Sequence, residues 1–174
     1  MANHKTEQLV LMGLAAAFIC ITGPLVIMLP FSPVPLSLCT FTIYLFGYLL
    51  GCKQVMTSVL LYLLIGFFGL PVFAGFTSGP GKLLGPTGGY LLGYLLIALF
   101  CGLSKGKSRK SLLLFSLMGT VACYIPGTLW LAFQSGLNIS AAFTAGVLPF
   151  LPGDLVKIVC AVFLAPSIQK RLHL

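Results

Sequence analysis

Two ionisable residues, Asp154 and Lys157, lie inside the apolar stretch "PFLPGDLVKIV" at 149–159. Residues three apart lie on the same face of an α-helix, so the carboxylate and the ammonium group are predicted to be neighbours. A carboxylate accepts hydrogen bonds from N–H groups, and an ammonium group attracts anions and other oxygen acceptors. The pair suits a small, mostly apolar ligand with a few polar groups. A purely structural ion pair that locks the helix to its neighbours is the alternative.

The glycine-rich stretch at 69–90, "GLPVFAGFTSGPGKLLGPTGGY", is the second candidate for a site. Glycine lets main chain approach a ligand closely, and non-helical backbone at membrane depth must be buried by protein or line a cavity. Such a composition excludes a regular helix and predicts a loop that caps a pocket. Thr87 can cap the helix that follows, whose free N–H groups can receive an anion. A packed plug that needs glycine only for its turns is the alternative.

The composition identifies the kind of element that must position these residues. The chain has 174 residues, of which 59% are hydrophobic and only 7% are charged, whereas soluble domains carry about 25% charged residues. It has two acids in total, Glu7 and Asp154. We therefore expect an integral membrane protein. The net charge of +8 does not indicate a nucleic-acid partner, because the basic residues cluster at the ends of apolar runs, as membrane topology requires.

Six apolar segments are long enough to be considered as membrane-spanning helices, which need about 20 residues each. The second, third and fourth are short, so we expect them to begin or end within the interface. The predicted fold is all-α: one domain, 1–174, built as a compact bundle of six transmembrane helices, with the glycine-rich loop on the outer side between helices three and four. The predicted helices are 8–29, 36–52, 54–70, 87–104, 111–134 and 148–168.

The orientation in the membrane follows from the basic residues, because cytoplasmic loops carry an excess of lysine and arginine. With six spans, both termini lie on one side, and that side receives all the basic residues outside the spans except Lys82. Both termini are therefore predicted to be cytoplasmic, which places 69–90 and 133–146 outside. The cytoplasmic residues are Lys5, Lys53, Lys105, Lys107, Arg109, Lys110, Lys170 and Arg171.

Several kinds of chemistry are disfavoured by what the sequence lacks. The predicted spans contain one acid and no histidine, so a membrane enzyme is not expected. The six cysteines form no CxxC pair or His/Cys cluster, which argues against a metal site or a disulfide framework. "GLSKG" at 102–106 has the spacing of a serine nucleophile elbow but lacks its strand–turn–helix setting and a histidine partner. We therefore predict no catalytic residue, no metal and no cofactor.

The first helix carries small residues at a spacing that allows close helix packing. Gly13 and Ala17 lie four apart, with Ala16 and Cys20 beside them. Small residues at this spacing let two membrane helices approach closely. Docking on a separate membrane subunit and packing within the bundle both fit this pattern, and the sequence leaves the two open.

Several longer segments resemble one known family. The stretches "GLPVFAG" (69–75), "LLGPTGGYLLGY" (83–94) and "PFLPGDLVK" (149–157) are similar to the BioY family, the biotin-specific substrate-binding (S) components of energy-coupling-factor (ECF) transporters. "PVPLSLCT" (33–40) and "YIPGTLWLAF" (124–133) follow in the family's order. The resemblance covers nearly the whole chain, from the first helix through "PGDLVK".

The resemblance implies a six-helix S component that captures biotin from outside with high affinity. In this reading Asp154 accepts hydrogen bonds from the ureido N–H groups, and Lys157 offers a cation to a ligand oxygen, either the ureido carbonyl or the tail. Thr77 or Ser78 and loop backbone complete the ureido bonds, while Phe73 and Tyr90 pack the ring. The implied substrate-binding residues are Asp154, Lys157, Phe73, Thr77, Ser78, Gly79, Gly89 and Tyr90.

The resemblance also implies partners: a transmembrane coupling (T) subunit and two cytoplasmic ATPase subunits, which would use the ATP. The chain has no nucleotide-binding motif of its own, so uptake against a gradient needs such a partner. The implied location is the cell (inner) membrane of a bacterium. The alternatives are an S component for another small vitamin and an autonomous small-molecule facilitator.

Overall fold

The computed structural model describes residues 4–27 and 34–172, and these residues form eight helices and one short β-ribbon. The ribbon joins β1 (Val26–Ile27) to β2 (Leu36–Ser37) in antiparallel register, with Val26 opposite Ser37. The helices are α1 (His4–Thr22), α2 (Cys39–Leu50), α3 (Cys52–Phe67), α4 (Pro80–Leu84), α5 (Gly88–Gly102), α6 (Arg109–Ser135), α7 (Ile139–Gly146) and α8 (Leu151–Leu172). The fold is all-α, as predicted.

Helix α5 is the central element of the molecule. It packs against α2, α3 and α6, while α1 lies on α2 and α3, and α8 lies on α2 and α6. Glycines bring these helices close together. A Cβ added at Gly93 of α5 would lie 2.6 Å from the Cys123 sulfur on α6, and one added at Gly47 of α2 would lie 2.6 Å from Cβ of Cys101 on α5. Larger side chains at these two positions would separate the helices.

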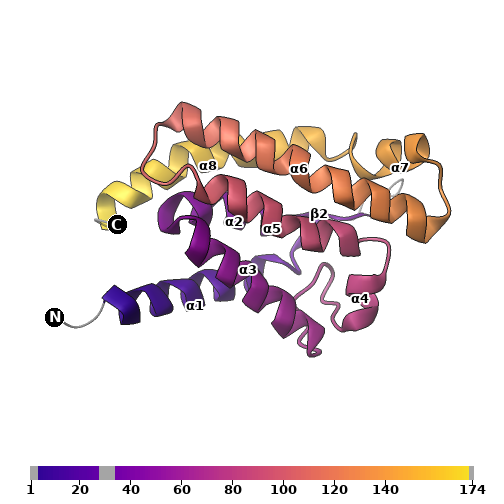
Figure 1. The fold of residues 1–174 in the computed structure, drawn as a ribbon, viewed down its shortest axis with the longest axis horizontal. Coiled ribbons are helices and arrows are strands. Elements are labelled where there is room, and N and C mark those ends of the chain that lie inside the picture. The colour runs from indigo at the N-terminus through magenta and orange to yellow at the C-terminus, as the bar shows by residue number, and fades with distance from the viewer. Residues whose placement is uncertain (1–3, 28–33, 173–174) are drawn as a thin grey trace.

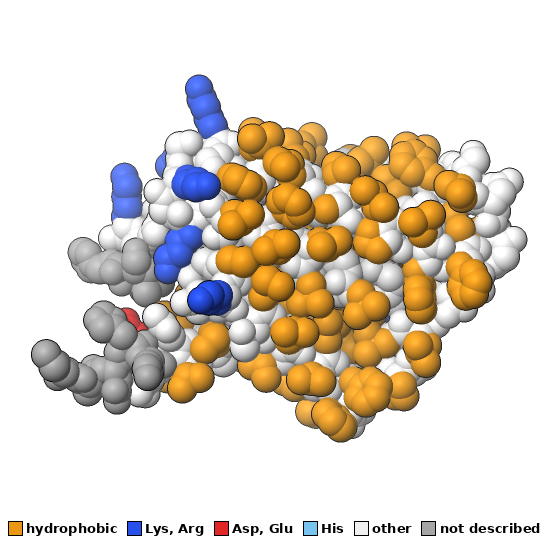
Figure 2. All heavy atoms as spheres, in the orientation of Figure 1, with side chains coloured by type: hydrophobic (Ala, Val, Ile, Leu, Met, Phe, Trp, Pro, Cys, Tyr) orange, Lys and Arg blue, Asp and Glu red, His pale blue; other side chains and the backbone are white. Residues whose placement is uncertain are grey.

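The two ends of the molecule differ in what they carry. Figure 1 shows the start of α1 and the end of α8 at one end, and the short helices α4 and α7 at the other. Lysine and arginine side chains gather at the first end, while hydrophobic side chains cover the body of the face shown in Figure 2. Large apolar side chains such as Phe133, Phe68 and Leu9 are strongly exposed. Soluble proteins rarely expose such continuous apolar surface, so this surface fits a lipid environment.

Two helices, α6 and α8, are long and apolar enough to cross a membrane by length and composition. The other apolar helices are shorter: α2 has 12 residues, α3 has 16 and α5 has 15. At 1.5 Å per residue, α2 is about 18 Å long, well short of a hydrocarbon core of about 30 Å. The expectation that the second to fourth helices are short is therefore met, and their lengths alone do not establish six spans.

The first helix ends earlier than the sequence analysis predicts. A helix over 8–29 was expected, but α1 ends at Thr22 and the chain then enters the ribbon. The prediction is wrong for 23–27, and 28–29 lie outside the described residues. Gly23 and Pro24 explain the break: a Cβ at Gly23 would lie 2.4 Å from the Val72 carbonyl oxygen, and proline cannot donate the next helical hydrogen bond.

Two stretches predicted as loops contain short helices. In the glycine-rich stretch, Pro80 occupies the first turn of the five-residue helix α4, so the expectation of no regular helix there is wrong for 80–84. The other stretch, 133–146, contains α7, whose N-cap is Asn138: its side chain accepts a hydrogen bond of 2.7 Å from the Ala141 N–H. Proline at a helix start and asparagine at an N-cap are the local signals for both helices.

Candidate functional site

The Asp154–Lys157 pair forms in the first half of α8, as the spacing predicts. The Lys157 Nζ lies 2.8 Å from Asp154 Oδ1, and both residues are buried, with 8% and 7% of their surface exposed. Two opposite charges taken out of water stabilise one another only when their remaining hydrogen-bonding capacity is also satisfied. The surroundings of the pair therefore determine what it can do.

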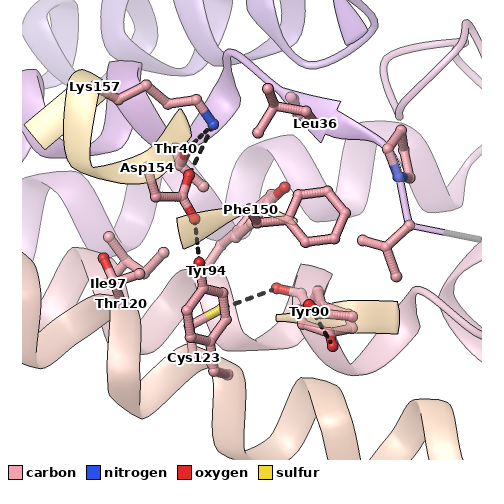
Figure 3. A pocket seen from close by; sticks show the side chains of 15 residues that line it. Leu36, Thr40, Tyr90, Tyr94, Ile97, Thr120, Cys123, Phe150, Asp154 and Lys157 are labelled. Atoms are coloured by element: carbon pink, nitrogen blue, oxygen red, sulfur yellow. Dashed lines mark hydrogen bonds and ion pairs between the residues drawn. The ribbon is translucent and has the colours of Figure 1, made fainter. Parts of the chain in front are cut away.

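Two neutral side chains from other helices complete the polar cluster (Figure 3). The Tyr124 hydroxyl on α6 donates a hydrogen bond of 2.5 Å to Asp154 Oδ2. Lys157 donates a second hydrogen bond, of 3.1 Å, to Thr40 Oγ1 on α2. Three helices thus meet at one buried ion pair. Tyr124 and Thr40 are not among the site residues predicted from the sequence.

A cavity of about 40 Å³ opens beside this cluster. Its walls are mostly apolar and aromatic, with the ion pair at one end and Tyr90 at the other (Figure 3). The Tyr90 hydroxyl donates a hydrogen bond of 3.0 Å to the Gly146 carbonyl, which fixes the ring against α7. The lining residues are Val34, Pro35, Leu36, Ser37, Thr40, Tyr90, Tyr94, Ile97, Thr120, Cys123, Tyr124, Gly146, Phe150, Asp154 and Lys157.

Of the sequence-predicted ligand residues, three line this cavity: Asp154, Lys157 and Tyr90. Tyr94, one helical turn after Tyr90, also lines it and was not predicted. A period of four residues along α5 is the signal that points to Tyr94, because residues four apart share a helix face. The cavity thus presents hydrogen-bonding groups at one end and flat apolar surfaces along its length.

The predicted loop residues lie elsewhere. Phe73 is fully buried in the core, where its ring packs edge-on against Tyr62 at 5.4 Å between centroids. Thr77 is exposed, and its hydroxyl donates to the Ala74 carbonyl at 2.9 Å. Ser78 and Gly79 are half-buried, and the Gly79 N–H donates to the Gly66 carbonyl at 2.7 Å. None of these four residues is among those that line the cavity.

Gly89 does not line the cavity and instead packs against α6. It lies in the first turn of α5, where an added Cβ would be 2.4 Å from Cβ of Trp130 and 2.7 Å from the Pro126 carbonyl oxygen on α6. Its lack of a side chain lets the start of α5 touch α6. This contact fixes the position of the next residue, Tyr90, which does line the cavity.

The four small residues of α1 divide between two faces. Gly13 and Ala17 are exposed, and a Cβ added at Gly13 would meet nothing within 4 Å. Ala16 is buried, with 4% of its surface exposed, and Cys20 is half-buried. The pair Gly13 and Ala17 therefore lies on the surface of the molecule, while Ala16 and Cys20 take part in packing within it.

Comparison with known proteins shows the family to which the chain belongs. The model of the BioY family matches residues 1–174. A probable biotin transporter BioY of Pyrococcus horikoshii is 42% identical over 90% of this chain and 94% of its own, and a biotin transporter BioY of Thermotoga maritima is 38% identical over 94% and 96%.

A solved structure gives the same result at the level of the fold. The S-component for biotin from an ECF-type ABC transporter superposes with a TM-score of 0.89 at 31% identity, over 98% of this chain and 94% of the other. These relatives are named as transporters and a transporter component, not as enzymes. The family model, the sequence relatives and the fold agree, and the chain belongs to the BioY family.

Proposed function

We propose that this chain is the substrate-binding S component of an ECF-type transporter and that it captures biotin for uptake. The observation that carries the proposal is the buried Asp154–Lys157 pair at one end of an apolar, aromatic cavity. Family membership supplies the transport role, and the relatives that are named biotin transporters supply the ligand. The proposed site residues follow from how their chemical groups match those of biotin.

Biotin has a ureido ring with two N–H donors and one carbonyl, an apolar thiophane ring and a carboxylate tail. Asp154 is suited to accept from the ureido N–H groups, because a carboxylate has only acceptors. Lys157 is suited to donate to a ligand oxygen. Tyr90, Tyr94 and Phe150 offer the apolar faces that would pack the thiophane ring and tail. Tyr124 and Thr40 hold the two charges in position.

Binding requires the cavity to widen. Pockets for ligands of drug size measure about 300–1,000 Å³, and this cavity measures about 40 Å³. Part of its wall, Val34 to Ser37, belongs to the segment around β2, and the neighbouring Ala74 belongs to the glycine-rich loop. We propose that these two segments move apart to admit biotin, which would also let Thr77, Ser78 and Gly79 approach it.

Phe73 and Gly89 then serve the site from a distance. Phe73 ties the loop to α3 through its buried ring, and Gly89 sets the contact between α5 and α6. We propose that both keep Tyr90 and the loop in register with the cavity. Direct contact with biotin would require larger movements of these two residues than of Thr77 or Ser78.

The chain is proposed to lie in the cytoplasmic (inner) membrane as a single domain, 1–174, with six membrane-embedded helices: α1, α2, α3, α5, α6 and α8. The basic end in Figure 2, where α1 begins and α8 ends, would face the cytoplasm under the positive-inside rule. The end with α4 and α7 would face outward, which places the glycine-rich loop on the side from which biotin arrives.

Energy for uptake would come from partners: a transmembrane coupling subunit and two cytoplasmic ATPase subunits. The similarity to an S component of an ECF-type ABC transporter supports partners of this kind. We propose that the coupling subunit docks on the face of α1 that carries Gly13 and Ala17, because those residues are exposed, whereas Ala16 and Cys20 pack inward. The chain itself would hold no cofactor.

Calorimetry on the purified protein in detergent tests the proposal. Biotin is expected to bind far more tightly than thiamine or riboflavin. Its ureido ring offers N–H donors to the single carboxylate and a carbonyl oxygen to the single ammonium group, and neither of the other vitamins matches this pair as well. Equal binding of the three vitamins would remove the substrate assignment. Preference for another vitamin would keep the transport role and replace the ligand.

A further inference from the structure

A second cavity, of about 30 Å³, lies beside the first and shares part of its wall. Tyr90 and Tyr94 line both cavities, as do residues of the segment that leads into β2. Neither Asp154 nor Lys157 lines the second one, which instead reaches Lys82 of α4 and Thr87 at the start of α5. The two cavities are therefore neighbours that differ in their polar groups.

The hydroxyl of Thr87 is an orphan in this second cavity. Thr87 has 8% of its surface exposed, and its Oγ1 is the one buried side-chain oxygen or nitrogen without a hydrogen-bond partner among residues 6–27 and 34–171. Thr87 occupies the N-cap position of α5, yet its side chain does not cap the helix. Buried polar groups without partners are rare in folded proteins, and a ligand is one physical explanation for this one.

Lys82 supplies a positive charge to the same cavity. Its side chain is half-buried and makes no hydrogen bond or ion pair with any part of the chain that the structure describes. The chain has only two acids: Asp154 is already paired with Lys157, and Glu7 lies in the first turn of α1. The described part of the chain therefore provides no carboxylate to Lys82, and an anion from outside can take that place.

Contacts from α6 hold these groups in position. The Trp130 indole N–H donates to the Gly85 carbonyl at 2.9 Å, and the Gln134 side chain donates to the Leu84 carbonyl. Both acceptors lie between Lys82 and Thr87, at the junction of α4 and α5. The N-terminus of α5 carries a partial positive charge, so it favours a bound anion, as Lys82 does.

We propose that the second cavity is a carboxylate subsite, in which Lys82 pairs with the carboxylate of the ligand tail and Thr87 donates a hydrogen bond to it. This inference rests on the proposed function and deepens it. The ureido ring would lie at Asp154 and Lys157, the tail would pass along Tyr90 and Tyr94, and its carboxylate would end at Lys82. Lys157 then serves the ureido carbonyl, not the tail.

The test compares two ligands that differ only at the tail: biotin and biotin methyl ester, which has no negative charge. The wild-type protein is expected to bind biotin about tenfold to a hundredfold more tightly than the ester, the range of a charge-assisted hydrogen bond. Lys82→Met should remove that preference by weakening biotin and leaving the ester within about twofold. Thr87→Val should reduce the preference by a smaller factor, and Lys82→Arg should retain it.

Lys53→Met is the matched control, because it removes the same charge from the exposed surface at the start of α3. It should leave both affinities unchanged. Equal binding of biotin and ester by the wild type would overturn the subsite without any variant, as would equal loss of both ligands in Lys82→Met. Failure of the wild type to bind either ligand would instead overturn the proposed function.

Discussion

Each charge of the buried pair has one charged and one neutral partner. Asp154 uses one oxygen for Lys157 and the other for the Tyr124 hydroxyl, and Lys157 adds Thr40. Removing one member of such a pair leaves an uncompensated charge in an apolar interior, which is more costly than replacing both. A structural role and a ligand-binding role for the pair therefore predict different results in single and double variants.

Asp154→Asn is expected to weaken biotin binding by at least about 1–3 kcal/mol, because the ureido N–H groups lose a charged acceptor. Calorimetry measures this loss, and Glu7→Gln is the control because it neutralises the chain's other acid, in α1. The double variant Asp154→Asn, Lys157→Met should regain thermal stability without regaining affinity. If the double variant recovers both, the pair is structural and the ligand lies elsewhere.

Contacts within the candidate site could be predicted from the sequence where they join residues that are close together along the chain. The Asp154–Lys157 pairing follows from a spacing of three on one helix. Tyr124 and Thr40 lie 30 and 117 residues away along the chain, so only the packing of α2, α6 and α8 brings them together. The burial of Phe73 could not be foreseen for the same reason, since it depends on a glycine of α3 beneath its ring.

At the scale of elements, helix existence was predicted better than helix ends. Helix α5 runs over Gly88–Gly102 against a prediction of 87–104, because glycines and a proline mark its start. The end of α1 was misplaced because the apolar run continues past Gly23 and Pro24. Hydropathy alone does not distinguish an apolar helix from an apolar β-strand that follows it. Helix α7 was missed because its eight residues are far fewer than the about 20 that a membrane-spanning helix needs.

Gly66 of α3 makes two contacts with the glycine-rich loop. The Phe73 ring lies over Gly66, where an added Cβ would be 2.1 Å from the ring atom Cζ, and the Gly66 carbonyl accepts the Gly79 N–H at 2.7 Å. Phe73 is fully buried, so its ring has no free space into which to shift. The position of the Phe73 ring thus requires a residue without a side chain at position 66 of α3.

Gly66→Val is therefore expected to expel Phe73 and to destabilise the protein by about 1–3 kcal/mol, as overpacking does elsewhere. Thermal unfolding in detergent measures the change, and limited proteolysis should find new cleavage within 69–79. Gly81→Ala is the matched control, because a Cβ there meets nothing within 4 Å and its φ is not positive. An unaltered melting temperature for Gly66→Val would contradict the assigned role of this contact.

At the scale of the whole molecule, the surface has regions that differ in charge and in side-chain size. Basic side chains gather at one end, and apolar side chains cover the body of the face shown (Figure 2). The second cavity is lined in part by Ala74 and Lys82 of the glycine-rich loop. The exposed small residues Gly13 and Ala17 interrupt a face of α1 that otherwise presents large apolar side chains such as Leu9, Leu14 and Phe18. A shallow path of this kind lets another helix approach closely.

Gly13→Leu and Ala17→Leu should therefore leave the fold and biotin affinity unchanged but impair assembly with the proposed coupling subunit. Gly13 has open space around it, so a leucine there fills no internal volume, and the cavity lies on other helices. Pull-down of the coupling subunit with each variant measures assembly, and calorimetry measures biotin affinity. Ser167→Leu is the control: it adds a leucine to exposed surface on a different helix, α8. Loss of assembly in Ser167→Leu, or full assembly in both α1 variants, would move the docking surface away from α1.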